Sequence, residues 1–299
     1  MACKLIVVKI KYIPMEIQIL KSDQDLAVHF KNLIMLLVDK FQPTRIISFG
    51  QQTLQNQIEG CFGSKEVKHQ HHCLLICTES CTRIDYEIQD FVNAHYSAGQ
   101  ITIICHGEST IKEGIDSNNR FFITVLTDGK PVYTKDGFFN IDPIPKFNPN
   151  GSMEKANKYF SHRISLAHGF FECARESLAK GNYNITAFLL HQVVEQSCIG
   201  LIRVHIAYRS EFHNIYRLLG LCRSFSDAPF NILVGEKPSE RRLFDILSKS
   251  YGKARYASEF SVTRKDAEEL YDKVSSFIEL VESMCRNKIK ALSTLTTSE

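Results

Sequence analysis

The sequence predicts two domains of different class: an α/β domain with a small mixed sheet over residues 1–137, and an all-α antiparallel helical bundle over residues 153–290. Short apolar runs alternate with helix-spaced stretches in the first half, which is typical of α/β domains. Residues 138–152 hold three of the chain's eight prolines, a composition typical of a linker. Helical spacing then continues to a short tail at 291–299.

Bulk composition places the chain among ordinary globular proteins. Of its 299 residues, 44% are hydrophobic and 23% are charged, and the net charge of +3 is too small to indicate nucleic acid binding by electrostatics alone. Its ten cysteines form no CxxC pair, so we expect reduced thiols in a cytoplasmic protein. No apolar stretch has the length of a membrane span, and we expect no membrane partner.

The α/β domain is predicted element by element. Residues 4–13 are a candidate strand, Ser22 and Asp25 have capping-box spacing before a helix, and Pro43 ends that helix directly before a strand at 45–49. The apolar positions of the helix are Leu26, Phe30, Leu33, Leu37 and Phe41.

Further strands are expected at 74–77 and 100–105, with a helix over 84–96 between them. Residues 121–134 are predicted to form a pair of strands, because Asp128-Gly129 is a strong hairpin signal.

Three long helices are predicted in the second domain. Apolar residues recur at helical spacing over 160–178, and Gly181-Asn182 ends that helix. A second helix is expected over about 185–207, and a third after Thr263, which has capping-box spacing to Asp266.

The second domain resembles a HEPN domain over roughly residues 155–285. The similar stretches are YFSHRISLAHGFFECARESLAKGNYNITAFLLHQVVEQSCIGLI, YRSEFHNIYRLLGLC and YGKARYASEFSVTRKDAEELYDKVSSFIELV. They include Gln192, Glu195 and His213, and His213 stands where the family carries its characteristic histidine. The resemblance implies a homodimer formed through the helical domain.

The first domain resembles a minimal nucleotidyltransferase of the polymerase-β type. The order helix, proline, strand, Gly50 matches that family, and VLTDGKPVYT resembles its closing segment. However, Gln51 stands where the family has serine, and His71 and Cys73 occupy its two aspartate positions. The strand QITIIC also lacks a third carboxylate.

These replacements predict an inactive nucleotidyltransferase-like domain. Nucleotidyl transfer needs Mg²⁺ ions, which prefer carboxylate oxygens, whereas imidazole and thiolate suit softer metals. His69, His71 and Cys73 alternate on a predicted strand and would share one face with Cys77. Such a face could bind Zn²⁺, which is the weaker alternative. The other is that these histidines contact only water. No cofactor is expected.

A metal-independent ribonuclease is the alternative function. Active HEPN ribonucleases carry Arg, four to six residues, then His, and the histidine acts at the scissile ribose-phosphate while the arginine contacts the phosphate. Arg209 and His213 have three residues between them, and near a helix start they could still face together. Arg163 and His168 have the literal spacing on the first helix. If the protein is not a ribonuclease, we expect His213 to cap or orient the start of a helix.

The remaining candidates are ligand-binding residues. Gln192 and Glu195 share a helix face, as either a hydrogen-bond latch or part of a pocket. Lys253, Arg255 and Tyr256 offer cations beside an aromatic ring, or else a solvated surface.

With Gly50 and Gln51, these residues predict a two-domain binding or regulatory protein for a nucleotide or another small polar ligand, held in the bundle or between the domains. RNA is a possible partner. A scaffold without a small ligand is the third alternative.

Overall fold

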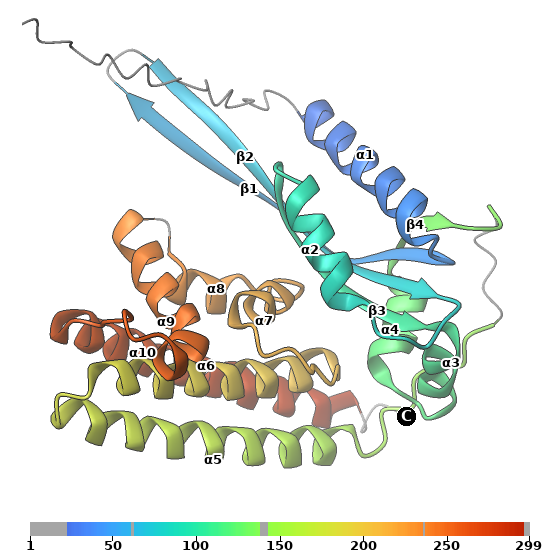
Figure 1. Cartoon of the computed structure of the whole chain (residues 1–299). Coiled ribbons are helices and arrows are strands. Elements are labelled where there is room, and N and C mark those ends of the chain that lie inside the picture. Colours follow the sequence, from blue (N-terminus) through green and yellow to red (C-terminus); the bar gives the residue numbers. More distant parts are fainter. Residues whose placement is uncertain (1–22, 61–62, 138–142, 236, 296–299) are drawn as a thin grey trace, which may run out of the picture.

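The computed structural model describes residues 23–60, 63–137, 143–235 and 237–295, of which residues 23–24, 54–60, 63–69 and 295 are described by their backbone alone. The candidate strand at 4–13 and Ser22 lie outside the described residues. Figure 1 shows the two parts of the chain, with the helical domain packed beside the α/β domain.

The α/β domain contains a four-stranded mixed sheet with the strand order β3-β2-β1-β4. Its strands β1 and β2 form a long antiparallel hairpin, and β2 continues through α2 to the parallel strand β3. The elements are α1 (Asp23–Phe41), β1 (Arg45–Gly60), β2 (Gly63–Thr78), α2 (Asp85–His95), β3 (Gly99–Gly107), α3 (Glu108–Asp116), α4 (Arg120–Asp128) and β4 (Lys130–Thr134).

The predicted hairpin around Asp128-Gly129 is wrong. Residues 120–128 form the helix α4, whose first turn begins where the backbone N–H of Phe121 donates a hydrogen bond to the side chain of Asn119 (3.0 Å). Gly129 ends this helix with a φ of −68°, so no left-handed turn follows. Only the second expected strand exists, as β4, and it pairs with β1.

Both faces of the sheet are buried around residues 73–77, which explains why this part of β2 is a continuous apolar run. Leu74 and Ile76 pack under α1 and α2, whereas Leu75 and Cys77 face α4 and the helical domain. Alternate residues of a strand point to opposite faces, so a strand covered on both sides is apolar at every position.

Within the described part of the second domain there are six helices. They are α5 (Ser152–Ala179), α6 (Tyr183–Ile206), α7 (Ile215–Cys222), α8 (Ala228–Leu233), α9 (Pro238–Tyr256) and α10 (Arg264–Leu295). The predicted helix start at Thr263 is confirmed, because the Thr263 hydroxyl accepts a hydrogen bond from the backbone N–H of Asp266 (3.1 Å). Helix α10 runs past residue 290, where the tail was expected to begin.

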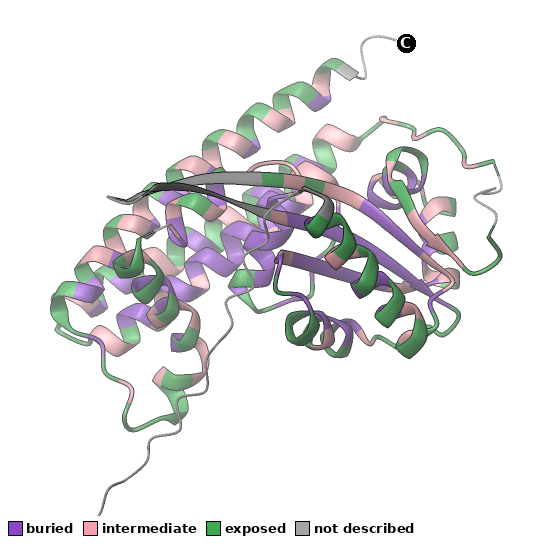
Figure 2. Cartoon of the chain, turned by 90° about the horizontal axis from the view of Figure 1, so that it is seen from above, coloured by how far each residue is buried: buried purple, intermediate pink, exposed green. Residues whose placement is uncertain are grey.

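Helix α6 is the centre of this bundle and packs against α5, α7, α9 and α10. By length and composition it could cross a membrane, but 72% of its most apolar window is buried inside the protein. Figure 2 shows buried residues concentrated in the middle of the molecule, on strands and on inner helices. Cytoplasmic localisation stays a prediction.

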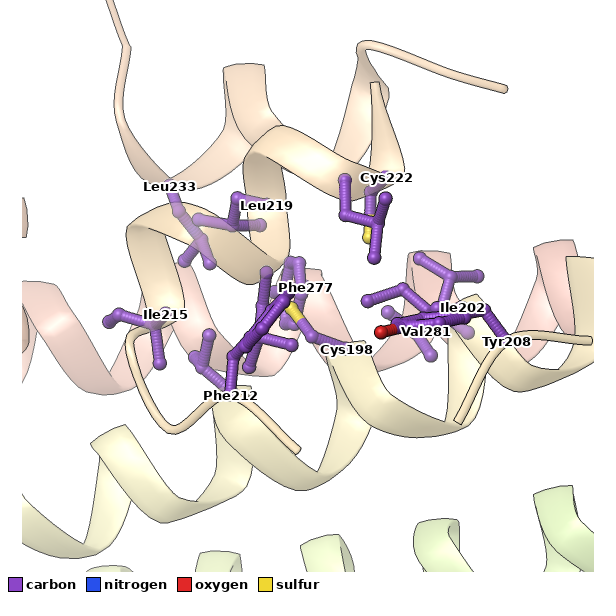
Figure 3. Packing of buried hydrophobic residues seen from close by; sticks show 14 of the residues in the cluster. Cys198, Ile202, Tyr208, Phe212, Ile215, Leu219, Cys222, Leu233, Phe277 and Val281 are labelled. Atoms are coloured by element: carbon purple, nitrogen blue, oxygen red, sulfur yellow. The ribbon is translucent and has the colours of Figure 1, made fainter. Parts of the chain in front are cut away.

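The core around α6 joins residues that lie far apart in the chain (Figure 3). Cys198 and Ile202 of α6, Phe277 of α10 and Phe212 of the α6–α7 loop belong to one cluster, and all four are fully buried. This packing fixes where the α6–α7 loop leaves the bundle, and that loop carries the predicted Arg209 and His213.

Candidate functional site

A cavity of about 460 Å³ in the helical domain contains three of the predicted site residues, Glu195, Arg209 and His213. We call it the helical cavity. Its lining residues are Tyr159, His162, Arg163, Glu195, Gln196, Ile199, Arg203, Tyr208, Arg209, Ser210, Glu211, Phe212 and His213.

Helix ends on both sides of the α6–α7 loop place Arg209 and His213 at this cavity. Helix α6 stops where Ala207 adopts a left-handed φ of 59°, and α7 begins at Asn214, whose side chain accepts a hydrogen bond from the backbone N–H of Arg217 (3.1 Å). Asn214 rather than His213 therefore caps α7. The loop, not a helical turn, brings Arg209 and His213 together.

His213 pairs with a buried carboxylate. Its Nδ1 lies 3.0 Å from Oε1 of Glu195, whose side chain is only 5% exposed, whereas the His213 side chain is 63% exposed. Because Nδ1 is engaged by the carboxylate, Nε2 is the ring nitrogen left to exchange a proton with a ligand. An imidazole held in this way is suited to general acid–base chemistry.

Gln192 supports Glu195 from the same helix. Its side-chain amide donates a hydrogen bond to Oε2 of Glu195 (3.4 Å), and Nε2 of His191 lies 3.8 Å from the same oxygen. Burial lowers the pKa of His191. Gln192 does not line the helical cavity, and its hydrogen bond to Glu195 lies within α6 rather than between helices.

Three arginines enter the helical cavity from different elements. Arg163 donates to the side chain of Gln196 (2.6 Å), and Arg203 donates to the carbonyl of Ala207 (2.9 Å) while its guanidinium lies 4.5 Å from the Tyr159 ring centre. For Arg209, within the described ranges, the structure shows no hydrogen bond or ion pair. Guanidinium groups bind phosphate through paired N–H donors.

Sequence reasoning missed Arg203, and it named Arg163 only for its spacing to His168, which pairs with Glu282 and does not line the helical cavity. Glu195, Ile199 and Arg203 recur at steps of four on α6, and this spacing is a signal that would have found Arg203. Arg163 lies on α5, and only the packing of α5 against α6 brings it to the cavity.

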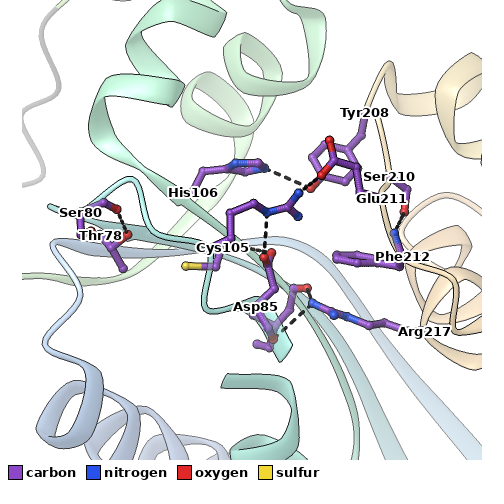
Figure 4. Close-up of polar contacts among 12 residues, drawn as sticks. Thr78, Ser80, Asp85, Cys105, His106, Tyr208, Ser210, Glu211, Phe212 and Arg217 are labelled. Atoms are coloured by element: carbon purple, nitrogen blue, oxygen red, sulfur yellow. Dashed lines mark hydrogen bonds and ion pairs between the residues drawn. The ribbon is translucent and has the colours of Figure 1, made fainter. Parts of the chain in front are cut away.

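The α/β domain holds the α6–α7 loop in place (Figure 4). Arg83 forms an ion pair with Glu211 of the loop and donates to Asp85 (3.1 Å), which is buried. Nε2 of His106 lies 3.0 Å from the Tyr208 hydroxyl, so a second hydrogen bond joins the domains. The α/β domain therefore contacts the loop that carries Arg209 and His213 at two points, Tyr208 and Glu211.

Arg217 of α7 completes this interface. Its guanidinium is buried against the Phe212 ring at 3.5 Å and donates to the carbonyl of Ile103 on β3 (2.7 Å). Burial lowers the pKa of Arg217.

Helix α7 also packs against the sheet face that carries Cys73 and Thr102. A Cβ added to Gly220 of α7 would lie 2.3 Å from the Thr102 hydroxyl, and one added to Gly50 would lie 3.0 Å from Cα of Ser224. The Cys73 sulfur lies 3.6 Å from the carbonyl oxygen of Gly220.

His71 and Cys73 contact each other where α7 packs against the sheet. Nε2 of His71 lies 3.3 Å from the Cys73 sulfur, burial lowers the pKa of His71 to about 3, and burial raises the pKa of the Cys73 thiol. The part of the chain that the structure describes holds no group of three or more His, Cys, Asp or Glu residues able to bind a metal. The His69 side chain is not described.

Gly50 and Gln51 line a second cavity, of about 480 Å³, which lies between the domains and which we call the interdomain cavity. Its wall includes three cationic side chains, Arg120, Lys130 and Lys288, together with Asp128. Arg120, Asp128 and Lys130 come from α4 and the start of β4, whereas Lys288 comes from α10, so no local pattern connects all four.

Lys253, Arg255 and Tyr256 lie on the last turn of α9 and line neither cavity. The Arg255 guanidinium lies 5.0 Å from the Tyr256 ring centre and 4.4 Å from that of Tyr251, and its Nε donates to the Tyr251 carbonyl (2.7 Å). This arrangement is a surface cluster whose arginine already has its partners.

Comparison with known proteins bears on the helical domain. The crystal structure of an archaeal HEPN homologue aligns with 42% of this chain and 97% of its own, at 22% sequence identity and a TM-score of 0.33. No curated protein matches the chain. The family model of the HEPN domain matches residues 160–284, a range that includes the α6–α7 loop and most of the helical cavity. Residues 160–284 therefore form a HEPN domain.

Proposed function

We propose that this is a two-domain binding or regulatory protein whose HEPN domain binds a nucleotide, or another small phosphorylated ligand, in the helical cavity. The observation that carries the proposal is the convergence of Arg163, Arg203 and Arg209 beside the exposed His213. HEPN domains form a family with nucleotide- and RNA-related roles, which agrees with such a ligand.

The α/β domain has a supporting role in this proposal, as an inactive nucleotidyltransferase-like module. Two observations support it. Helix α7 occupies the sheet face beside His71 and Cys73, and Asp128 is the only carboxylate among the described residues that line the cavity containing Gly50. A single carboxylate cannot hold the pair of Mg²⁺ ions that phosphoryl transfer uses.

Ligand binding is tested with the full chain by isothermal titration calorimetry against AMP, ADP and ATP, with adenosine as the uncharged comparison. We expect the phosphorylated ligands to bind and Arg209→Ala to weaken binding about tenfold, because it removes one charge-assisted contact. Arg209 is exposed, so the variant should fold as the wild type does.

Lys253→Ala is the matched control, since Lys253 is also an exposed cation but lies outside the helical cavity. Loss of binding in Lys253→Ala with none in Arg209→Ala would move the site to the α9 surface. No binding of any nucleotide would refute the proposal and leave the scaffold alternative.

Metal-independent ribonuclease activity is the second candidate, and the pairing of His213 with Glu195 favours it. We expect cleavage of a mixed RNA pool in the presence of EDTA, abolished in His213→Ala and reduced in Glu195→Gln, because the carboxylate orients the imidazole. Arg255→Ala should cleave like the wild type. If the wild type leaves RNA intact, this candidate falls while nucleotide binding stays open.

A further inference from the structure

The interdomain cavity lies where four elements of the two domains meet. Residues 48–51 of β1 and the helix α4 form one wall, and the C-terminal ends of α6 and α10 form the other. Its volume of about 480 Å³ lies within the range of small-molecule sites. It shares no lining residue with the helical cavity.

Three cations face a single carboxylate in this cavity. Arg120, Lys130 and Lys288 line it together with Asp128, and within the described ranges none of the three cations forms an ion pair. The wall therefore carries a net charge of +2 at neutral pH, counting three positive groups and one negative group.

Arg120 is held in position before any ligand arrives. Its Nη2 donates to the carbonyl oxygens of Val204 (2.7 Å) and His205 (3.2 Å), which lie in the last turn of α6. Those carbonyls have no partner within their own helix, so the contact satisfies them and fixes the guanidinium. Its other N–H donors make no hydrogen bond that the described residues show.

Lys288 and Arg120 are both partly buried and repel each other. Burial, and after it the charge of Arg120, lowers the pKa of Lys288, and burial lowers the pKa of Arg120. Keeping two such cations charged without a counter-ion costs free energy, and an anion placed between them would recover it.

The lining of the cavity also includes an apolar surface. Phe49 and Phe121 meet edge to face with ring centres 5.4 Å apart, and Val125 and Ile206 continue this surface. An aromatic or aliphatic group could pack there while charged groups reach the cations.

We propose that the interdomain cavity is a second binding site, for a small phosphorylated molecule that carries at least two negative charges. Its phosphate groups lie against Arg120, Lys130 and Lys288, and its apolar part lies against Phe49 and Phe121. Because Arg120 also holds the end of α6, the ligand contacts both domains at the start of the loop that carries Arg209 and His213.

The test uses the full chain carrying Arg209→Ala, so that the helical cavity contributes little, with pyrophosphate and ATP as probes and adenosine as the uncharged comparison. Calorimetry should show binding of both charged probes. Lys288→Gln and Lys130→Gln should each weaken pyrophosphate binding about tenfold, as expected for one charged contact. Asp128→Asn should strengthen it, a change that unfolding cannot imitate.

Lys290→Gln is the matched control, because Lys290 is an exposed lysine of the same helix that does not line the cavity. If pyrophosphate does not bind, or binds equally to Lys288→Gln and Lys290→Gln, the inference is wrong. If Arg209→Ala by itself abolishes nucleotide binding, the helical cavity remains a binding site and the interdomain cavity is not one.

Discussion

At the scale of single residues, burial keeps several histidines neutral. Burial is the largest cause that lowers the pKa of His71 to about 3 and the pKa of both His72 and His205 to about 4. His72 is stacked on Phe30 of α1 with ring centres 4.2 Å apart, so protonation would place a charge inside the packed domain.

These pKa values predict acid sensitivity. An unfolded histidine with a pKa near 6.5 takes up its proton as the pH falls below that value, while the folded group stays neutral until about pH 4. The free energy of unfolding should therefore be greatest above pH 6.5 and fall as the pH drops from 6.5 towards 4. Urea titrations between pH 7 and pH 5 measure this slope.

The variant His72→Gln should lose about 1–2 kcal/mol less than the wild type over that interval, because one titrating group is gone. His95→Gln, at an exposed position of α2, is the control. Equal slopes in the wild type and in His72→Gln would contradict the assignment.

At the scale of elements, α7 joins the domains because a glycine lets it approach the sheet. Gly220 faces Thr102 and Gln100 of β3, where an added Cβ would lie 2.3 Å from the Thr102 hydroxyl and 3.1 Å from the Gln100 amide nitrogen. The threonine side chain is branched at Cβ and has few alternative rotamers, so the contact cannot relax easily.

Gly220→Ala should consequently lower the free energy of unfolding by about 1–3 kcal/mol, the usual range for overpacking. Gly169→Ala is the matched control in α5, since an added Cβ meets nothing within 4 Å there. It should raise stability by about 0.5–1 kcal/mol through helix propensity. Chemical denaturation of both variants measures the difference, and a stabilised Gly220→Ala would show that α7 does not press on β3.

At the scale of the whole molecule, the two domains share one apolar core. Ile47, Leu75 and Ile104 of the sheet belong to the same buried cluster as Leu219 and Phe277 of the HEPN domain. Because this cluster is continuous, we expect the domains to unfold together rather than one after the other.

The homodimer stays a prediction at this scale. Tyr159 and Leu166 lie seven residues apart on α5, so they share one helix face, and both side chains are exposed. We expect sedimentation to give twice the 34.2 kDa chain mass, and Leu166→Glu to give the monomer by placing a charge in the contact. Met35→Glu, an equally exposed apolar site on α1, should stay dimeric. A monomeric wild type at micromolar concentration would end this prediction.

The spacing of apolar residues predicted much of the fold. The wrong hairpin prediction at residues 121–134 has a physical cause. The long helices of the HEPN domain follow from apolar residues at steps of three and four, which only a helix places on one face. Residues 121–126 are apolar at nearly every position, and such a run suits a strand or a buried helix equally. Packing of Phe121, Phe122 and Val125 into the shared core made it the helix α4.

The candidate sites divide in the same way. Glu195, Arg209 and His213 lie within 19 residues of one another, and they meet in one cavity. Arg163 and Arg203 meet in the helical cavity only because α5 packs against α6, and Lys288 joins Arg120 and Lys130 in the interdomain cavity only because the two domains pack together. Residue spacing predicts which side chains are neighbours within one helix or strand, but not which side chains meet between two elements.

The sequence by itself determined the change from an α/β domain to a helical one and the HEPN resemblance, because each depends on residue types at short range. Only the tertiary structure decided that α7 covers the sheet face beside His71 and that Lys288 joins Arg120 and Lys130 around a cavity. Both depend on which surfaces come into contact when the apolar faces of the two domains are buried together. That contact depends on residues far apart in the chain.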